Sequence, residues 1–313
     1  MKTLTQLKTF LLLGTTITLI ASCSSNIMDN TNTEDMSSAK ISDYNYLGDI
    51  HNLFMSNIQE HLTTDQKIES VDEGIDYILD FNTRLVAKID IDKYGIDKRD
   101  FIKGLSYYKN LVNAVHFENA LVEQNDTRAN LSNKSVLTLN DFETLANDSV
   151  LDVSDLPNVK SLVNFVKDND LITTETYNYL QELLSLIDKS VAGLISDEKF
   201  EQELDQMIAK IDNAKYQKEC PTINTVGPVF ALSKSSLQWW EENPQAIPVE
   251  GKIPHVVAMD AAGAIVGVAW NLGINWFQGT SPTWTGVGVS AAVGAINGST
   301  GIVGKVGKFL KSL

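Results

Sequence analysis

The side chains that most often do chemistry are dispersed along this chain. The four histidines, His51, His61, His116 and His255, form no HExxH pattern, and none lies at metal-ligand spacing from a cysteine. The chain has no GxSxG, P-loop or dinucleotide-binding fingerprint. Its carboxylates are so numerous that no single pair stands out as an acid and base.

The segment KDNDLITTE, around Asp168 and Asp170, has only part of a calcium-loop pattern. It lacks the central glycine and the bidentate glutamate at the twelfth position, so an aspartate-rich helix start is the better interpretation. The sequence therefore predicts a protein that is not an enzyme and that uses no cofactor and no metal.

The N-terminus has the three parts of an export signal. Lys2 and Lys8 supply a positive start, and an apolar segment from 10 to 20 follows that is too short to span a bilayer as a finished helix. The segment ends in Ile20-Ala21-Ser22-Cys23, which resembles the lipobox of bacterial lipoproteins.

This resemblance implies that 1–22 is a lipoprotein signal peptide and that Cys23 becomes a lipidated N-terminus. It further implies a lipid-anchored protein of the bacterial cell envelope, at the outer membrane, with the membrane as partner through acylated Cys23. An ordinary secretory signal with a chance cysteine is the alternative. Residues 23–42 are polar and predict a flexible tether. With Cys23 lipidated, Cys220 is expected to be a buried free thiol or to form an intermolecular bridge.

The formal net charge of −15 is distributed unevenly. Residues 221–313 hold five lysines against four acids, so all of the acidic excess precedes Cys220. All five tryptophans follow it. This change in composition predicts an acidic unit at 43–219 and a different segment at 220–313. The acidic balance argues against nucleic acid as a partner, because phosphate binding needs clustered Lys and Arg.

Residues from about 43 to 215 predict an antiparallel helical bundle. Apolar side chains recur at helical spacing, as in Leu47, Ile50, Phe54, Ile58 and Leu62. Three helix starts share a capping side chain between an apolar residue and an aromatic five positions later. They run from Ile96 to Phe101, from Ile172 to Tyr177 and from Ile195 to Phe200. Asp148-Ser149-Val150 resembles a bacterial O-glycosylation triplet, which makes Ser149 a candidate modification site.

The C-terminal segment predicts a Gly/Ala-rich helical hairpin. No charged side chain occurs from Ala261 to Gly304, and helices are expected at 256–277 and 284–304 with a turn between them. Spaced prolines before the hairpin predict a connector with one short helix at 233–243. The fold class is therefore all-α, a bundle followed by a hairpin.

Small residues recur at four-residue spacing in both arms of this hairpin. The helix-packing candidates are Gly263, Gly267, Gly294 and Gly298, with Ser290 in the same row. With the flanking aromatics and lysines, the hairpin is similar to the glycine-zipper segments of bacteriocin-like membrane-active proteins. That resemblance makes membrane-contact candidates of Trp270, Trp276, Trp284, Lys305, Lys308 and Lys311.

Two functions remain open. The first is a non-enzymatic binding or structural module of the envelope, with the hairpin completing its core. The second is a membrane-active protein whose hairpin inserts into or associates with a bilayer. Self-association through the hairpin is a further possibility. Asp260, Asn271 and Asn275 oppose insertion, so the arms are only marginally hydrophobic.

Overall fold

A computed structural model describes residues 38–62, 84, 97–99, 101–102, 156–244 and 253–312. Cys23, Ser149, the signal peptide and most of the predicted tether lie outside these residues. The described part is all-α, as predicted. It contains a short 3-10 helix, η2 (Ile41–Tyr44), and seven α-helices. These are α2 (Asn45–Leu62), α6 (Leu156–Asp168), α7 (Thr174–Val191), α8 (Asp197–Asn213), α9 (Pro221–Glu242), α10 (Ile253–Gln278) and α11 (Trp284–Ser312).

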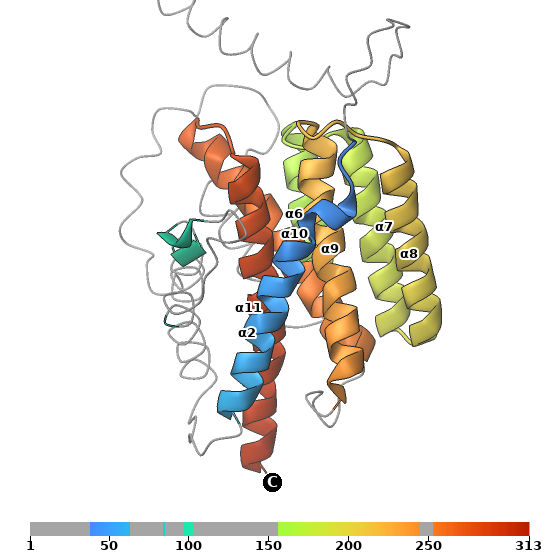
Figure 1. The fold of residues 1–313 in the computed structure, drawn as a ribbon, viewed down its shortest axis with the longest axis vertical. Helices are drawn as coiled ribbons and strands as arrows, with labels where there is room; N and C mark the ends of the chain where they lie inside the picture. Colours follow the sequence, from blue (N-terminus) through green and yellow to red (C-terminus); the bar gives the residue numbers. More distant parts are fainter. Residues whose placement is uncertain are drawn as a thin grey trace, which may run out of the picture.

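Helix α10 occupies the middle of this bundle. It contacts α11, α9, α6, α7 and α8, and α2 lies across α9 and α11 (Figure 1). A single hydrophobic core runs from Leu47 and Phe54 on α2 to Ala295 and Ile296 on α11. The C-terminal hairpin is thus enclosed by the other helices, and it supplies much of the core that they surround.

The predicted helix starts are present with their caps. At the first of them, Asp97 Oδ1 accepts the amide proton of Arg99 at 2.8 Å, and Phe101 is buried. The hydroxyl of Thr173 accepts the amide proton of Thr176 at 3.0 Å, and the hydroxyl of Ser196 accepts that of Lys199 at 3.3 Å. Each cap satisfies one of the amide groups that a helix start leaves without an intrahelical partner. Phe200 is fully buried in the core, as expected for a residue of the first turn that packs inward.

The prediction of a connector with one short helix before the hairpin is wrong. Helix α9 runs unbroken from Pro221 to Glu242. Pro221 occupies the first helical turn, where its missing amide proton costs nothing. Pro228 removes one hydrogen bond inside the helix, but every side chain from Thr222 to Ser233 is buried. Burial therefore outweighs the local penalty of the proline.

Helices α10 and α11 form the predicted hairpin and touch backbone to backbone. A Cβ atom on Gly263 would lie 2.1 Å from the carbonyl oxygen of Gly294, and one on Gly267 would lie 1.9 Å from that of Ser290. A Cβ on Gly298 would lie 2.2 Å from the carbonyl oxygen of Met259. The contacting pairs are therefore Met259 with Gly298, Gly263 with Gly294 and Gly267 with Ser290. They are spaced four residues apart on each helix and run in opposite directions, which fixes one antiparallel register.

Gly267→Ala should destabilise the fold although alanine favours a helix over glycine by about 1 kcal/mol. The added methyl meets backbone that cannot move aside, and overpacking of this kind costs about 1–3 kcal/mol. The measurement is urea unfolding of the non-lipidated chain. Gly288→Ala is the matched control, because its Cβ would lie 3.2 Å from the flexible end of Leu47. Equal stabilisation by both substitutions would contradict close contact at Gly267.

Candidate functional site

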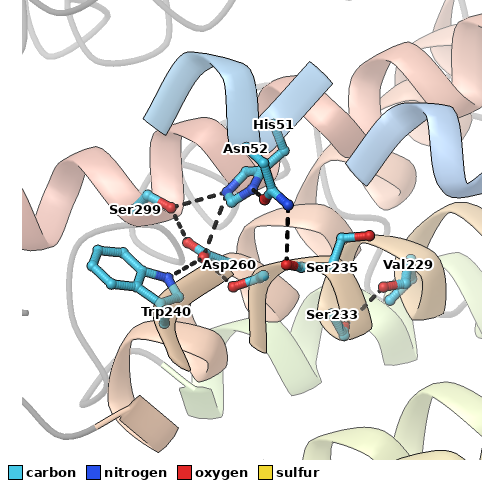
Figure 2. A network of polar contacts seen from close by, with 9 residues as sticks. His51, Asn52, Val229, Ser233, Ser235, Trp240, Asp260 and Ser299 are labelled. Carbon is cyan, nitrogen blue, oxygen red and sulfur yellow. Dashed lines mark hydrogen bonds and ion pairs between the residues drawn. The ribbon is translucent and has the colours of Figure 1, made fainter. Parts of the chain in front are cut away.

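Polar side chains from four helices meet inside the core. We define the buried polar cluster as His51 on α2, Ser236 and Trp240 on α9, Asp260 on α10 and Ser299 on α11 (Figure 2). None of the five is more than 1% exposed. Because buried polar groups are costly unless they are hydrogen-bonded, the partners of each group determine what the cluster does.

Asp260 is the centre of the cluster. Its Oδ2 accepts a hydrogen bond from the Ser236 hydroxyl at 2.5 Å and another from Trp240 Nε1 at 3.0 Å. Its Oδ1 accepts the hydroxyl proton of Ser299. Asp260 is the only acidic side chain in α10 and α11, so these donors compensate the one carboxylate of the hairpin.

His51 completes the cluster as a doubly protonated imidazolium. Its Nδ1 lies 3.0 Å from Asn52 Oδ1, and the amide of Asn52 is oriented because its nitrogen donates to the carbonyl of Ser235 at 3.2 Å. Nδ1 must therefore carry a proton. Its Nε2 lies 3.1 Å from Ser299 Oγ, whose own proton goes to Asp260, and 3.5 Å from Asp260 Oδ2. Nε2 also faces only acceptors and must also carry a proton.

The electrostatics agree with this assignment. Burial alone lowers the pKa of His51, but the negative charge of Asp260 and the hydrogen bonds to Asp260 and Asn52 outweigh it, so the pKa is raised above its usual value. His51 and Asp260 therefore form a buried ion pair between α2 and α10. Both side chains are fully buried, so each charge depends on the other for compensation.

The cluster contains Ser, His and Asp, but its geometry does not activate a nucleophile. In a catalytic triad the histidine takes the serine proton on one nitrogen while the acid holds the other nitrogen. Here the Ser299 hydroxyl donates to Asp260, and Ser299 and Asp260 both face Nε2 of His51. The other ring nitrogen, Nδ1, is bound by Asn52. Because it is almost completely buried, the cluster is equipped to hold four helices together.

The membrane-contact candidates do not form one surface. Trp270 is buried at 4% exposure, whereas Trp276 and Trp284 are partly buried and flank the α10–α11 turn. The other candidates, Lys305, Lys308 and Lys311, belong to the last turns of α11, at the opposite end of that helix. The four helix-packing glycines all lie where α10 and α11 touch.

The sequence patterns mark neither member of the buried pair as a site. His51 is one of four scattered histidines, and Asp260 is predicted only to oppose insertion into a membrane. One signal points to it: a single acid inside a long apolar helix needs a buried partner. Among the described residues no group of three His, Cys, Asp or Glu side chains could hold a metal ion. Asp168 ends α6, and Asp170 lies in the turn that follows.

Cys220 is buried and disulfide-bonded, so the prediction of a free thiol there is wrong.

In the described part of the chain, one helix is long and apolar enough to cross a membrane, Val256–Gln278. In its most apolar stretch, 89% is buried inside the fold. The central helix of a soluble bundle has the same length and composition, so this feature by itself is weak support for a membrane span.

The stability that His51 contributes should depend on pH. Because its folded-state pKa is raised, the contribution is fully present below the ordinary value of about 6.5 and is lost as pH rises through the folded-state pKa. His51→Gln should lower the free energy of unfolding by about 3–5 kcal/mol near pH 6, because it leaves Asp260 without its counter-charge. The difference from wild type should shrink as the pH rises.

Urea unfolding of the non-lipidated chain from pH 6 to 9 provides the measurement. Tyr44→Phe is the control, because it removes a remote hydrogen bond, from the Tyr44 hydroxyl to Asn224 Oδ1 at 2.8 Å, and leaves His51 in place. A wild-type minus His51→Gln difference that stays constant across this range would rule out a charged His51.

Comparison with known proteins identifies no relative. No family model, no curated protein and no solved structure matches this chain.

Proposed function

We propose that this protein is a lipid-anchored, non-enzymatic binding or structural module of the bacterial cell envelope, held at the outer membrane through Cys23. The lipobox-like Ile20-Ala21-Ser22-Cys23 supports the anchor. Three acyl chains suffice for stable attachment, because each buried methylene contributes about 0.8 kcal/mol.

The observation that carries the module function is the covering of the hairpin. Every residue from Val256 to Trp270 is buried. Helices α2, α6, α7 and α9 lie around the hairpin. The single carboxylate of the hairpin has three hydrogen-bond donors and a counter-charge. A hairpin that is satisfied in this way is stable without lipid contact.

An acidic outer surface supports a role in binding other proteins. Helix α8 carries six acids against two lysines and lies at the edge of the bundle (Figure 1). Glu201 and Asp205 of α8 form ion pairs with Lys234 of α9, whose Nζ lies 2.9 Å from a carboxylate oxygen of each. The charge that faces solvent favours partners with basic surfaces and disfavours nucleic acid.

A second function, membrane activity, has one specific observation in its favour. Helices α10 and α11 have 26 and 29 residues, which exceeds the roughly 20 needed to cross a bilayer. The hairpin would have to leave its neighbours and give up the ion pair with His51 before it could insert. A membrane-active form therefore requires a large rearrangement, and this ranks it behind the module.

Cys23→Ser should release the protein from membranes, because no other residue can take the lipid. Cys220→Ser is the matched control and should leave membrane fractionation and lipid labelling unchanged. Both are measured by fractionation of cells and by mass spectrometry of the N-terminus. If the wild type instead forms an intramolecular disulfide, both variants would lose the same mobility shift on non-reducing gels, and neither would change fractionation.

Vesicle leakage separates the two functions. The module should cause no leakage from anionic or neutral vesicles when the non-lipidated wild type is added at micromolar concentration. A membrane-active protein should cause leakage, and replacing Lys305, Lys308 and Lys311 by Gln should weaken it, since each basic residue near an anionic surface contributes about 1 kcal/mol. His51→Gln should then leak more than wild type, because its hairpin is held less firmly.

A further inference from the structure

Several connections of the described chain meet at one end of the bundle, which we call the anchor end. It comprises the start of the described chain at 38–41 and the turns at 169–173, 214–220 and 279–283 (Figure 1). The amide of Ala39 donates to the carbonyl of Tyr216 at 2.8 Å, which places the start beside the α8–α9 turn. The hydroxyls of Thr173 and Thr222 lie 3.0 Å apart and join the α6–α7 turn to the same place.

The tip of the hairpin belongs to this end and is lined by aromatic rings. Phe277, at the end of α10, stacks on Phe165 near the end of α6, with 6.1 Å between ring centroids. Trp276 packs edge-on against both rings, at 4.7 Å from Phe277 and 6.0 Å from Phe165. Trp276, Phe277 and Trp284 are all partly exposed, and the turn between them has no charged side chain.

Partly exposed tryptophans beside an uncharged turn suit the interface between lipid and water. An indole ring has an apolar body and one polar N–H group, and such rings gather at headgroup level. Lys215 and Lys218 stand beside Glu219 in the neighbouring α8–α9 turn, so charge at the anchor end is mixed. The aromatic rings are therefore the feature that distinguishes this end.

The opposite end of the bundle, which we call the acidic end, is named for the acids of two helices. Asp197 and Glu198 begin α8 there, and Glu241 and Glu242 end α9. The last turns of α11, with its three lysines, belong to the same end (Figure 1). With 22 residues, α9 separates the two ends by about 33 Å.

The position of the chain start relates these two ends to the membrane. Roughly fifteen residues separate Cys23 from Ser38, where the described chain starts at the anchor end. A lipid on Cys23 would thus hold the anchor end closer to the bilayer than the acidic end.

We infer that the anchor end rests on the bilayer, with Trp276, Phe277 and Trp284 at the level of the lipid headgroups and the acidic end turned away from the membrane. This inference rests on the proposed lipid anchor. It gives the module a fixed orientation in which α8 and the end of α9 are presented to partners.

Tryptophan quenching in vesicles tests the orientation. The lipidated full chain is reconstituted into vesicles of neutral lipids brominated either close to the headgroup or deep in the acyl chain. Bromine close to the headgroup should quench the wild type. The double variant Trp276→Phe/Trp284→Phe should show at least a twofold smaller quenched signal. Trp239→Phe is the matched control, because Trp239 is buried near the acidic end and its loss should leave the quenched signal unchanged.

The alternative results have separate meanings. Protein that floats with the vesicles but is not quenched, or a double variant quenched as strongly as wild type, would overturn the orientation and leave the anchor standing. Stronger quenching by the deep bromine, with Trp270 contributing, would mean that the hairpin inserts and would also overturn surface contact. Protein that does not float would remove the lipid anchor, and the orientation with it.

Discussion

The arrangement of this bundle depends on the compensation of one buried carboxylate. The charge of Asp260 lies in the interior, where an unpaired ion would cost several kcal/mol even after relaxation. Its donors come from α9 and α11, and its counter-charge comes from α2. The cluster therefore fixes three helices around α10 at defined positions, whereas apolar contacts alone would tolerate sliding of one helix along another.

The hairpin adds a second constraint that acts on the same helices. Backbone contact at Gly263, Gly267 and Gly298 admits one register of α10 against α11. In that register Ser299 reaches Asp260, and Asn271 donates to the Ser290 hydroxyl at 3.1 Å. A slip of a single residue would bring side chains into the backbone contact and separate both polar pairs. Close packing and polar pairing thus select the same structure.

The features that could be predicted from the sequence are local ones. The caps at Thr173 and Ser196 and the start of α11 at Trp284 follow from neighbouring residues. Helix α9 was missed because its prolines disfavour a helix locally, and only tertiary burial offsets them. The buried cluster was missed because its members are far apart in sequence: His51 and Ser299 are separated by 248 positions. Pairing at that distance leaves no periodic pattern in a single sequence.

That separation also bears on the order in which the core can form. The cluster needs His51 from the first described helix and Ser299 from the last. A chain that crosses a membrane in an extended state cannot close this core until nearly all of its residues have emerged on the far side. Such long-range contacts slow folding in general. If the chain is exported, as the proposed lipid anchor requires, these contacts would delay the enclosure of the apolar hairpin until the chain has crossed the membrane.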